Sequence, residues 1–184
     1  MSKVSELRLH ARNRKLPAAI RLDRVQPELL AHNLYIYTDL SSDPANFTGT
    51  RTAEEREDNA VVGVSTGRDV YDLGEFYNQI HSDDICLPLS SLNLYNTRFA
   101  MLESGHKIDY HMDPPNIYNI ISPLTDPINF ETKDRQVEMQ VGDVWFVNPS
   151  FMHMTDHQSN ETRVAILANF NYKEEVYEHL AGIL

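Results

Sequence analysis

Closely spaced turn residues cut the second half of this chain into short apolar segments, and this punctuation most constrains the fold. Gly, Pro, Asn, Asp and Ser recur between the segments, for example at Asp113-Pro114-Pro115 and at Gly142-Asp143. Such residues favour tight turns, and apolar stretches this short are typical of strands. The segments span residues 94–102, 117–121, 136–140, 144–147, 151–155 and 162–170. Many short strands with regular turns predict a β-sandwich or a β-barrel.

The first part of the chain does not show this regular alternation of apolar segments and turn residues. Residues 1–33 predict an irregular or partly helical arm, because Pro17 and Pro27 would break a long helix. The aromatic-rich run at residues 34–37 predicts a short strand.

Three further segments complete the outline. Polar residues 39–60 predict a long surface loop. Apolar side chains three to four residues apart predict helices over 72–81 and 174–183. We therefore expect one domain spanning residues 1–184, with three consecutive parts: an N-terminal arm, loop and helix (1–91), a β-barrel core (92–172) and a C-terminal helix (173–184).

The composition indicates an ordinary globular protein. Of its 184 residues, 41% are hydrophobic and 23% are charged, which does not fit a disordered chain. No apolar run approaches the roughly 18–20 residues that a membrane-spanning helix needs. The single cysteine, Cys86, excludes an intrachain disulfide framework and a cysteine-rich zinc site. Because no apolar leader follows Met1, we expect a cytoplasmic protein.

Charge is distributed unevenly along the chain. Seven Lys and Arg residues against two acids give the first 24 residues a charge of +5, and the remaining nine against 25 acids give −16. A basic arm could contact nucleic acid or an acidic partner. An acidic body would repel a polyanion, so the sequence favours an arm that lies on the protein's own body or forms a homo-oligomer contact, and it does not favour nucleic-acid binding.

Two His-x-Asp pairs stand out as candidate metal ligands. His111 and Asp113 end a strand-like stretch before a Pro-Pro turn, and residues two apart on a strand point to the same face. His81 and Asp83 follow the predicted helix, where residues two apart diverge by about 200°. The first pair is therefore the better candidate for binding one ion.

A third ligand has to come from a distant strand. The candidates are His153 and His157, in residues 151–157, and His, carboxylate and His form the facial triad of non-haem Fe(II) oxygenases. Ten residues after His153, Arg163 opens an apolar run, where an arginine needs an anionic partner. That partner is either an aspartate at the strand end or the far carboxylate of a dicarboxylic co-substrate.

These motifs resemble, in order, those of the aspartyl/asparaginyl β-hydroxylase-like family of 2-oxoglutarate/Fe(II) dioxygenases, which also contains proline hydroxylases. Residues 98–113 resemble the family's Leu-x-x-Gly-x-x-Ile-x-x-His-x-Asp run. Residues 122–124 resemble the end of its next strand, and residues 142–150 resemble its Gly-Glu-Val-Trp-x-x-Asn stretch. His153 and Arg163 fall at the family's distal histidine and at the arginine ten residues later.

The resemblance implies a fold, a chemistry and a set of site residues. The fold would be a double-stranded β-helix, a cupin-like jelly roll. His111, Asp113 and His153 would bind Fe(II), and Arg163 would pair with the C5 carboxylate of the co-substrate 2-oxoglutarate. The enzyme would use O2 to hydroxylate a C–H bond while 2-oxoglutarate is decarboxylated to succinate.

The chain departs from the family pattern at two positions. Where members carry an arginine or histidine for the C1 carboxylate of 2-oxoglutarate, this chain has Asn119, which would donate one amide hydrogen bond. His157 replaces an asparagine four residues past the distal histidine. His153 lies ten residues before Arg163, as in the family pattern, and this spacing favours His153 over His157 as the metal ligand.

Two other function classes remain open from the sequence. A cupin-like metalloprotein that does not use 2-oxoglutarate would keep the three ligands without needing Arg163. A non-catalytic binding module would keep only the barrel. For an oxygenase, a free amino acid and a peptide residue both fit as substrate, and the absence of an added peptide-binding domain in these 184 residues favours a small molecule. The N-terminal half and the 39–60 loop would build its pocket.

Overall fold

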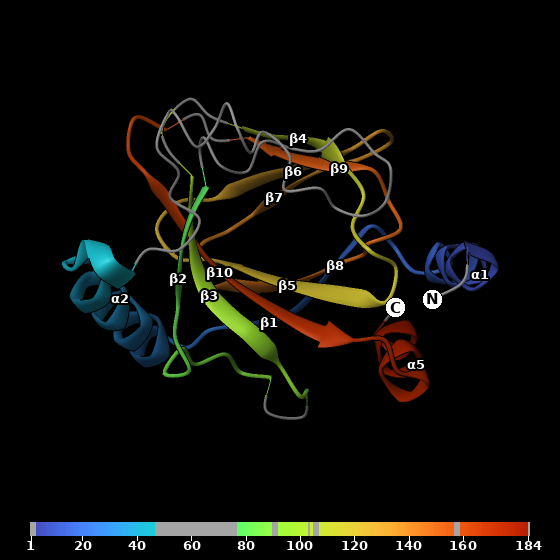
Figure 1. Ribbon diagram of the computed structural model, residues 1–184, viewed down its shortest axis with the longest axis horizontal. Coiled ribbons are helices and arrows are strands. Elements are labelled where there is room, and N and C mark those ends of the chain that lie inside the picture. Colours follow the sequence, from blue (N-terminus) through green and yellow to red (C-terminus); the bar gives the residue numbers. More distant parts are fainter. Residues whose placement is uncertain are drawn as a thin grey trace.

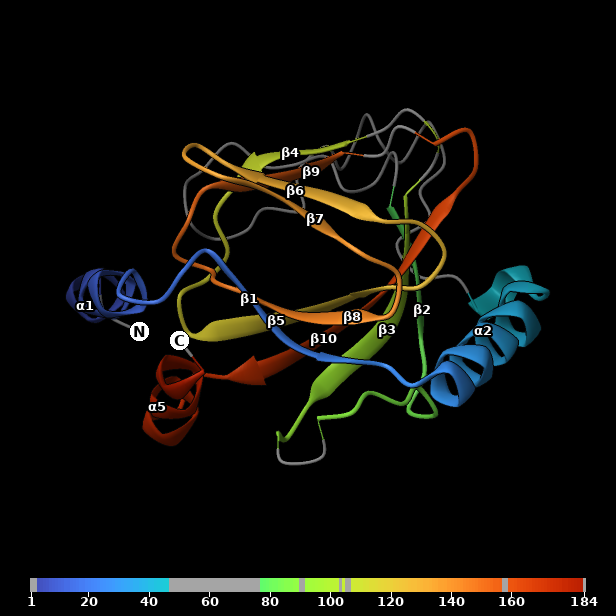
Figure 2. The same ribbon diagram turned by 180° about the vertical axis from the view of Figure 1, so that it is seen from behind.

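Two antiparallel β-sheets lie face to face in the protein (Figures 1 and 2). This computed structural model describes residues 3–46, 77–89, 92–102, 104, 107–156 and 159–183. Strands from the first and last parts of the chain pair within the same sheet, as they do in a jelly roll. The protein is thus the predicted mainly β, double-stranded β-helix with helices at both ends.

The larger sheet has six strands, and the smaller sheet has four. In spatial order the larger sheet contains β1 (Ala19–Arg24), β8 (Asp143–Val147), β5 (Ile117–Pro123), β10 (Arg163–Asn171), β3 (Tyr95–Leu102) and β2 (Tyr77–His81). The smaller sheet contains β4 (Lys107–His111), β9 (His153–Asp156), β6 (Ile128–Thr132) and β7 (Gln136–Met139). The helices are α1 (Lys3–Asn13), α2 (Pro27–Ser41), the 3₁₀ turn η1 (Pro44–Asn46) and α5 (Glu174–Gly182).

Strand β10 shows how the sequence separates the core from the space between the sheets. Successive side chains on a strand point to opposite faces. Val164, Ile166 and Phe170 belong to apolar clusters that also include residues from the helices. The alternate residues Arg163 and Ala165 line a cavity between the sheets. One strand therefore stabilises the fold with one face and shapes a site with the other.

The predicted strand at residues 34–37 is wrong, because these residues lie in helix α2. Pro27 occupies the first turn of this helix, where proline is favoured rather than disruptive. Leu30, Leu34, Tyr37 and Leu40 recur at helical spacing and pack on the cluster around Phe99. The helical period of the longer segment therefore outweighs the strand preference of four residues. The predicted loop at 39–60 is wrong at its start, where residues 39–41 end α2 and residues 44–46 form η1, and residues 47–60 lie outside the described residues.

The predicted helix at 72–81 is also wrong where it can be checked. Residues 77–81 form strand β2, and residues 72–76 lie outside the described part. Ile80 pairs with Phe99 of β3 and is almost fully buried. Pairing with the sheet edge has overridden the local helical spacing. His81 accordingly ends a strand, and Asp83 follows that strand rather than a helix.

Besides β2, the sequence did not predict β1 and β6. β1 lies within the segment predicted to be an arm, and it pairs with β8 at the edge of the larger sheet. β6 has alternating burial, with Ile128, Phe130 and Thr132 facing inwards. Its period of two was visible in the sequence, but polar residues interrupt the apolar run. The other predicted strands and the C-terminal helix are confirmed.

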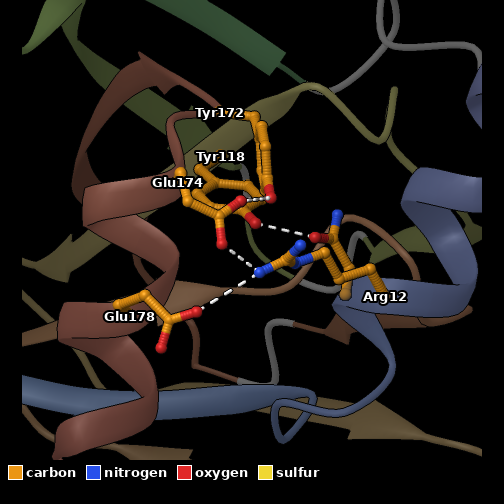
Figure 3. Close-up of polar contacts among 6 residues, drawn as sticks. Arg12, Tyr118, Tyr172, Glu174 and Glu178 are labelled. Carbon is orange, nitrogen blue, oxygen red and sulfur yellow. Dashed lines mark hydrogen bonds and ion pairs between the residues drawn. The ribbon is translucent and has the colours of Figure 1, made fainter.

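The basic N-terminal arm lies on the protein's own acidic body. Figure 3 shows Arg12 of α1 paired with Glu174 and Glu178 of α5. Nearby, the buried Asn13 accepts a 2.7 Å hydrogen bond from the hydroxyl of Tyr118 on β5. The exposed ion pairs contribute at most about 1 kcal/mol each, whereas the buried hydrogen bond fixes how α1 meets the sheet.

Ion pairs also hold the middle and the end of β1. Arg21 and Arg24 both pair with the buried carboxylate of Asp143 on β8, at 2.8 and 3.0 Å.

Among the described residues, no helix is long and apolar enough to cross a membrane.

Candidate metal centre and arginine pocket

A cavity of about 190 Å³ lies within the barrel, and it is lined by the five residues that the sequence predicts as metal ligands or co-substrate contacts. These residues are His111, Asp113, Asn119, His153 and Arg163. Most of the remaining wall is aliphatic. Polar groups that converge in an apolar cavity are the usual form of a small-molecule site.

The two histidines are brought together by strand pairing. β4 ends at His111, β9 begins at His153, and the two residues are direct partners in the antiparallel ladder. Their rings lie 4.3 Å apart between centroids. Asp113 follows β4, and its two carboxylate oxygens each lie 3.6 Å from the Nε2 atom of a different histidine. The structure thus gathers the three predicted metal ligands at one point.

The surroundings of His153 favour a neutral imidazole whose Nε2 faces the cluster. The side chain is buried between the sheets and stacks on Phe130. Its Nδ1 lies 3.0 Å from the carbonyl oxygen of Phe151, to which a protonated Nδ1 donates. Burial lowers the pKa of His153, with the nearby Asp113 carboxylate acting in the opposite direction. A neutral ring with Nδ1 protonated leaves the Nε2 lone pair available to a metal.

A pair of asparagine side chains holds the carboxylate of Asp113. The Asn119 amide nitrogen donates to Oδ2 of Asp113 at 2.5 Å. The Asn119 oxygen in turn accepts from the amide nitrogen of Asn169 on β10. In this arrangement both ends of the Asn119 amide are occupied, which points to a role in orienting Asp113. The contact of Asn119 with the C1 carboxylate of 2-oxoglutarate stays a prediction.

Arg163 enters the same cavity from the start of β10. It is only 4% exposed, although it carries a permanent charge. Its Nη1 donates to the carbonyl oxygen of Asp156 at 2.6 Å, and its Nη2 lies 3.4 Å from the hydroxyl of Thr155. Both partners belong to β9, the strand that begins with His153. These contacts place the guanidinium next to the strand that carries one of the candidate ligands.

The donor set fits a divalent transition metal. The His and Asp ligand atoms of His111, Asp113 and His153 all lie within 4.8 Å of one another. Ligand atoms about 2.0–2.2 Å from a common metal are roughly 3.0–3.5 Å apart, close to the 3.6 Å His–Asp separations. Two imidazoles and one carboxylate on one side of an ion are the ligands of non-haem Fe(II) sites, which leave other positions open.

A second arginine, which the sequence motifs did not single out as a site residue, also lines the cavity. Arg98 of β3 lines it, and Asn169 links this arginine to Asn119. The signal was present, because residues 98, 100 and 102 share one face of a strand whose alternate residues are apolar. His157, the alternative metal ligand, lies outside the described residues.

Sequence comparison supports the resemblance seen in the motifs. The family model for aspartyl/asparaginyl beta-hydroxylase matches residues 78–172, just over half of the chain. This chain belongs to the aspartyl/asparaginyl β-hydroxylase family. The match contains all three candidate ligands together with Asn119 and Arg163. No curated protein sequence matches the chain.

Structural comparison shows the same fold in one distantly related protein. The crystal structure of SnoN, a non-heme alpha ketoglutarate dependent epimerase from nogalamycin biosynthesis, is 12% identical. The match covers 92% of this chain and 82% of that one, with a TM-score of 0.58. A predicted oxalate decarboxylase from Thermotoga maritima is 15% identical over 52% of this chain and 81% of its own, with a TM-score of 0.41. The first of these matches extends the fold likeness beyond the barrel core.

Proposed function

We propose that this member of the aspartyl/asparaginyl β-hydroxylase family is a 2-oxoglutarate- and Fe(II)-dependent hydroxylase of a small molecule or peptide residue. One observation carries the proposal: a buried arginine shares one cavity with a His–Asp–His cluster whose ligand atoms lie within 4.8 Å of one another. A metal triad alone would suit many cupin-like proteins. The buried cation is the feature that a dicarboxylic co-substrate requires.

His111, Asp113 and His153 would hold the metal. Bound Fe(II) would supply the redox chemistry that converts 2-oxoglutarate, O2 and a C–H bond into succinate, CO2 and a C–OH group. The protein's own contribution is to fix positions and charges. The hydrogen bond from Asn119 orients the Asp113 carboxylate, and the Phe151 carbonyl sets the His153 tautomer.

Arg163 would bind the C5 carboxylate of 2-oxoglutarate. Its contacts with Asp156 and Thr155 hold the guanidinium in place before any ligand arrives, which lowers the entropy cost of binding. Ala100 and Ala165 are direct partners on β3 and β10, and both line the cavity. Their small side chains leave room for the carbon chain of the co-substrate beside Arg163.

The proposal is tested by succinate formation. Purified protein is incubated with Fe(II), ascorbate, O2 and 2-oxoglutarate, and succinate is quantified with and without a metabolite panel. We expect Fe(II)-dependent succinate, and its loss in Asp113→Ala, which removes one ligand. Metal content of both proteins is measured in parallel. If Asp113→Ala binds iron and forms succinate normally, the triad is misassigned; wild-type protein that binds metal but consumes no 2-oxoglutarate points to the cupin-like alternative.

A further inference from the structure

Arg98 is the second cation of the cavity, and the role proposed for Arg163 does not account for it. On β3, Phe99 and Met101 pack into the outer core, whereas Arg98, Ala100 and Leu102 line the cavity. This alternation follows from the two-residue period of a strand. Arg98 is therefore directed into the site by the same pattern that places Ala100 there.

The guanidinium of Arg98 is held at one corner only. Its Nη1 donates to the carbonyl oxygen of Asn96 at 2.7 Å and to the side-chain oxygen of Asn169 at 3.1 Å. Its Nε is buried without a hydrogen-bond partner, and no carboxylate among the described residues forms an ion pair with it. A buried donor without a partner is costly, so a polar ligand would stabilise this arrangement. On its Nε side, a guanidinium can donate two hydrogen bonds to one carboxylate, from Nε and from the neighbouring Nη.

The local backbone is shaped to hold Arg98. The pairing of β3 with β10 shifts register between Arg98 and Tyr95, which is a β-bulge. Within the bulge, Asn96 has φ = 54°, in the left-handed region that asparagine tolerates better than most residues. Its carbonyl oxygen thereby accepts from Arg98. Bulges next to active sites commonly redirect a side chain.

Arg98 is connected to the candidate metal centre and separated from Arg163. Asn169 bonds to Arg98 and to Asn119, and Asn119 bonds to Asp113. Leu167, the β10 partner of Arg98, lies four residues from Arg163, or about 13 Å along the strand. The two arginines thus serve different ends of the cavity.

We propose that Arg98 binds the carboxylate of a small-molecule substrate, such as a free amino acid or hydroxy acid. The inference rests on the proposed function, in which Arg163 holds the C5 carboxylate of 2-oxoglutarate. A residue inside a peptide chain lacks an α-carboxylate, so within a peptide only an aspartyl or glutamyl side chain could give the Nε edge of Arg98 an anionic partner. The chemical class, rather than the individual compound, follows from this arrangement.

The test compares acids with their amides. Wild-type protein, Arg98→Gln and Arg98→Lys are assayed for succinate with a panel of L-amino acids and 2-hydroxy acids, each alongside its primary amide. We expect at least one acid to stimulate turnover and its amide to be at least about tenfold weaker. In Arg98→Gln, the KM for that acid should rise roughly 30-fold or more, while the KM for 2-oxoglutarate changes far less. Arg98→Lys should recover part of the loss.

A matched control and a binding measurement make each outcome decisive. Arg135→Gln, which changes an exposed arginine in the β6–β7 turn, should alter neither KM. Calorimetric binding of the same acids to Mn(II)-loaded protein tests Arg98 independently of turnover, so it can succeed even if the proposed function fails. Equal effects of acid and amide, the larger KM change falling on 2-oxoglutarate, or no acid that binds or stimulates would each overturn the proposal.

Discussion

Replacing Arg163 separates a 2-oxoglutarate enzyme from other metal-binding barrels. Its side chain is 4% exposed, so a carboxylate bound to it would be largely removed from water. Truncating one partner of a buried, hydrogen-bonded charge pair costs about 2–5 kcal/mol. At about 1.4 kcal/mol per tenfold change, Arg163→Ala should raise the apparent constant for 2-oxoglutarate roughly 30- to 4,000-fold. Metal binding should be nearly retained, because Arg163 is not a candidate ligand.

The assay is succinate formation as a function of 2-oxoglutarate concentration, with metal content measured on the same samples. Arg163→Lys keeps the charge but loses the planar pair of donors, so it should recover only part of the affinity. Arg135→Ala serves as the control, because its side chain is exposed. Melting temperatures show whether loss of the bond to Asp156 destabilises the fold. An unchanged dependence on 2-oxoglutarate in folded Arg163→Ala would refute the co-substrate assignment.

Three further predictions concern the support of the site and the fold. Asn119→Ala should weaken metal binding roughly 10- to 100-fold by releasing the Asp113 carboxylate; a competing chelator measures this, and an unchanged affinity would contradict it. Ile166→Ala should lower the free energy of unfolding by about 2–5 kcal/mol, because the side chain is fully buried; urea unfolding tests this, and a loss below about 1 kcal/mol would contradict the packing described. Deleting residues 1–24 should lower the melting temperature, because it removes β1 and the buried Ile20; an unchanged melting temperature would show that the arm contributes nothing.

The site could be predicted from sequence where spacing alone fixes geometry. His111 and Asp113 are two residues apart at a strand end, and strand pairing brings His153 opposite them. The ten-residue interval to Arg163 covers the turn that joins β9 to β10. Spacing alone indicated His111 and Asp113 and left His153 and His157 as alternatives for the third ligand, and the choice of His153 came from the family resemblance.

What the sequence did not reveal depends on contacts between distant segments. Residues 77–81 have helical spacing, yet they become a strand because the edge of β3 is available to pair with them. Residues 34–37 have strand preference, yet the helical face of α2 packs on the core. The role of Arg98 emerges only when Asn169 and Asn119 link it to Asp113. Each of these outcomes is decided by tertiary packing rather than by local preference.

The most direct test of the account is a crystal structure of the protein grown without oxygen in the presence of Mn(II) and 2-oxoglutarate. We expect one anomalous peak in contact with His111, Asp113 and His153, and one 2-oxoglutarate whose far carboxylate contacts Arg163. A metal bound elsewhere, or a 2-oxoglutarate molecule that leaves Arg163 without a carboxylate, would contradict it.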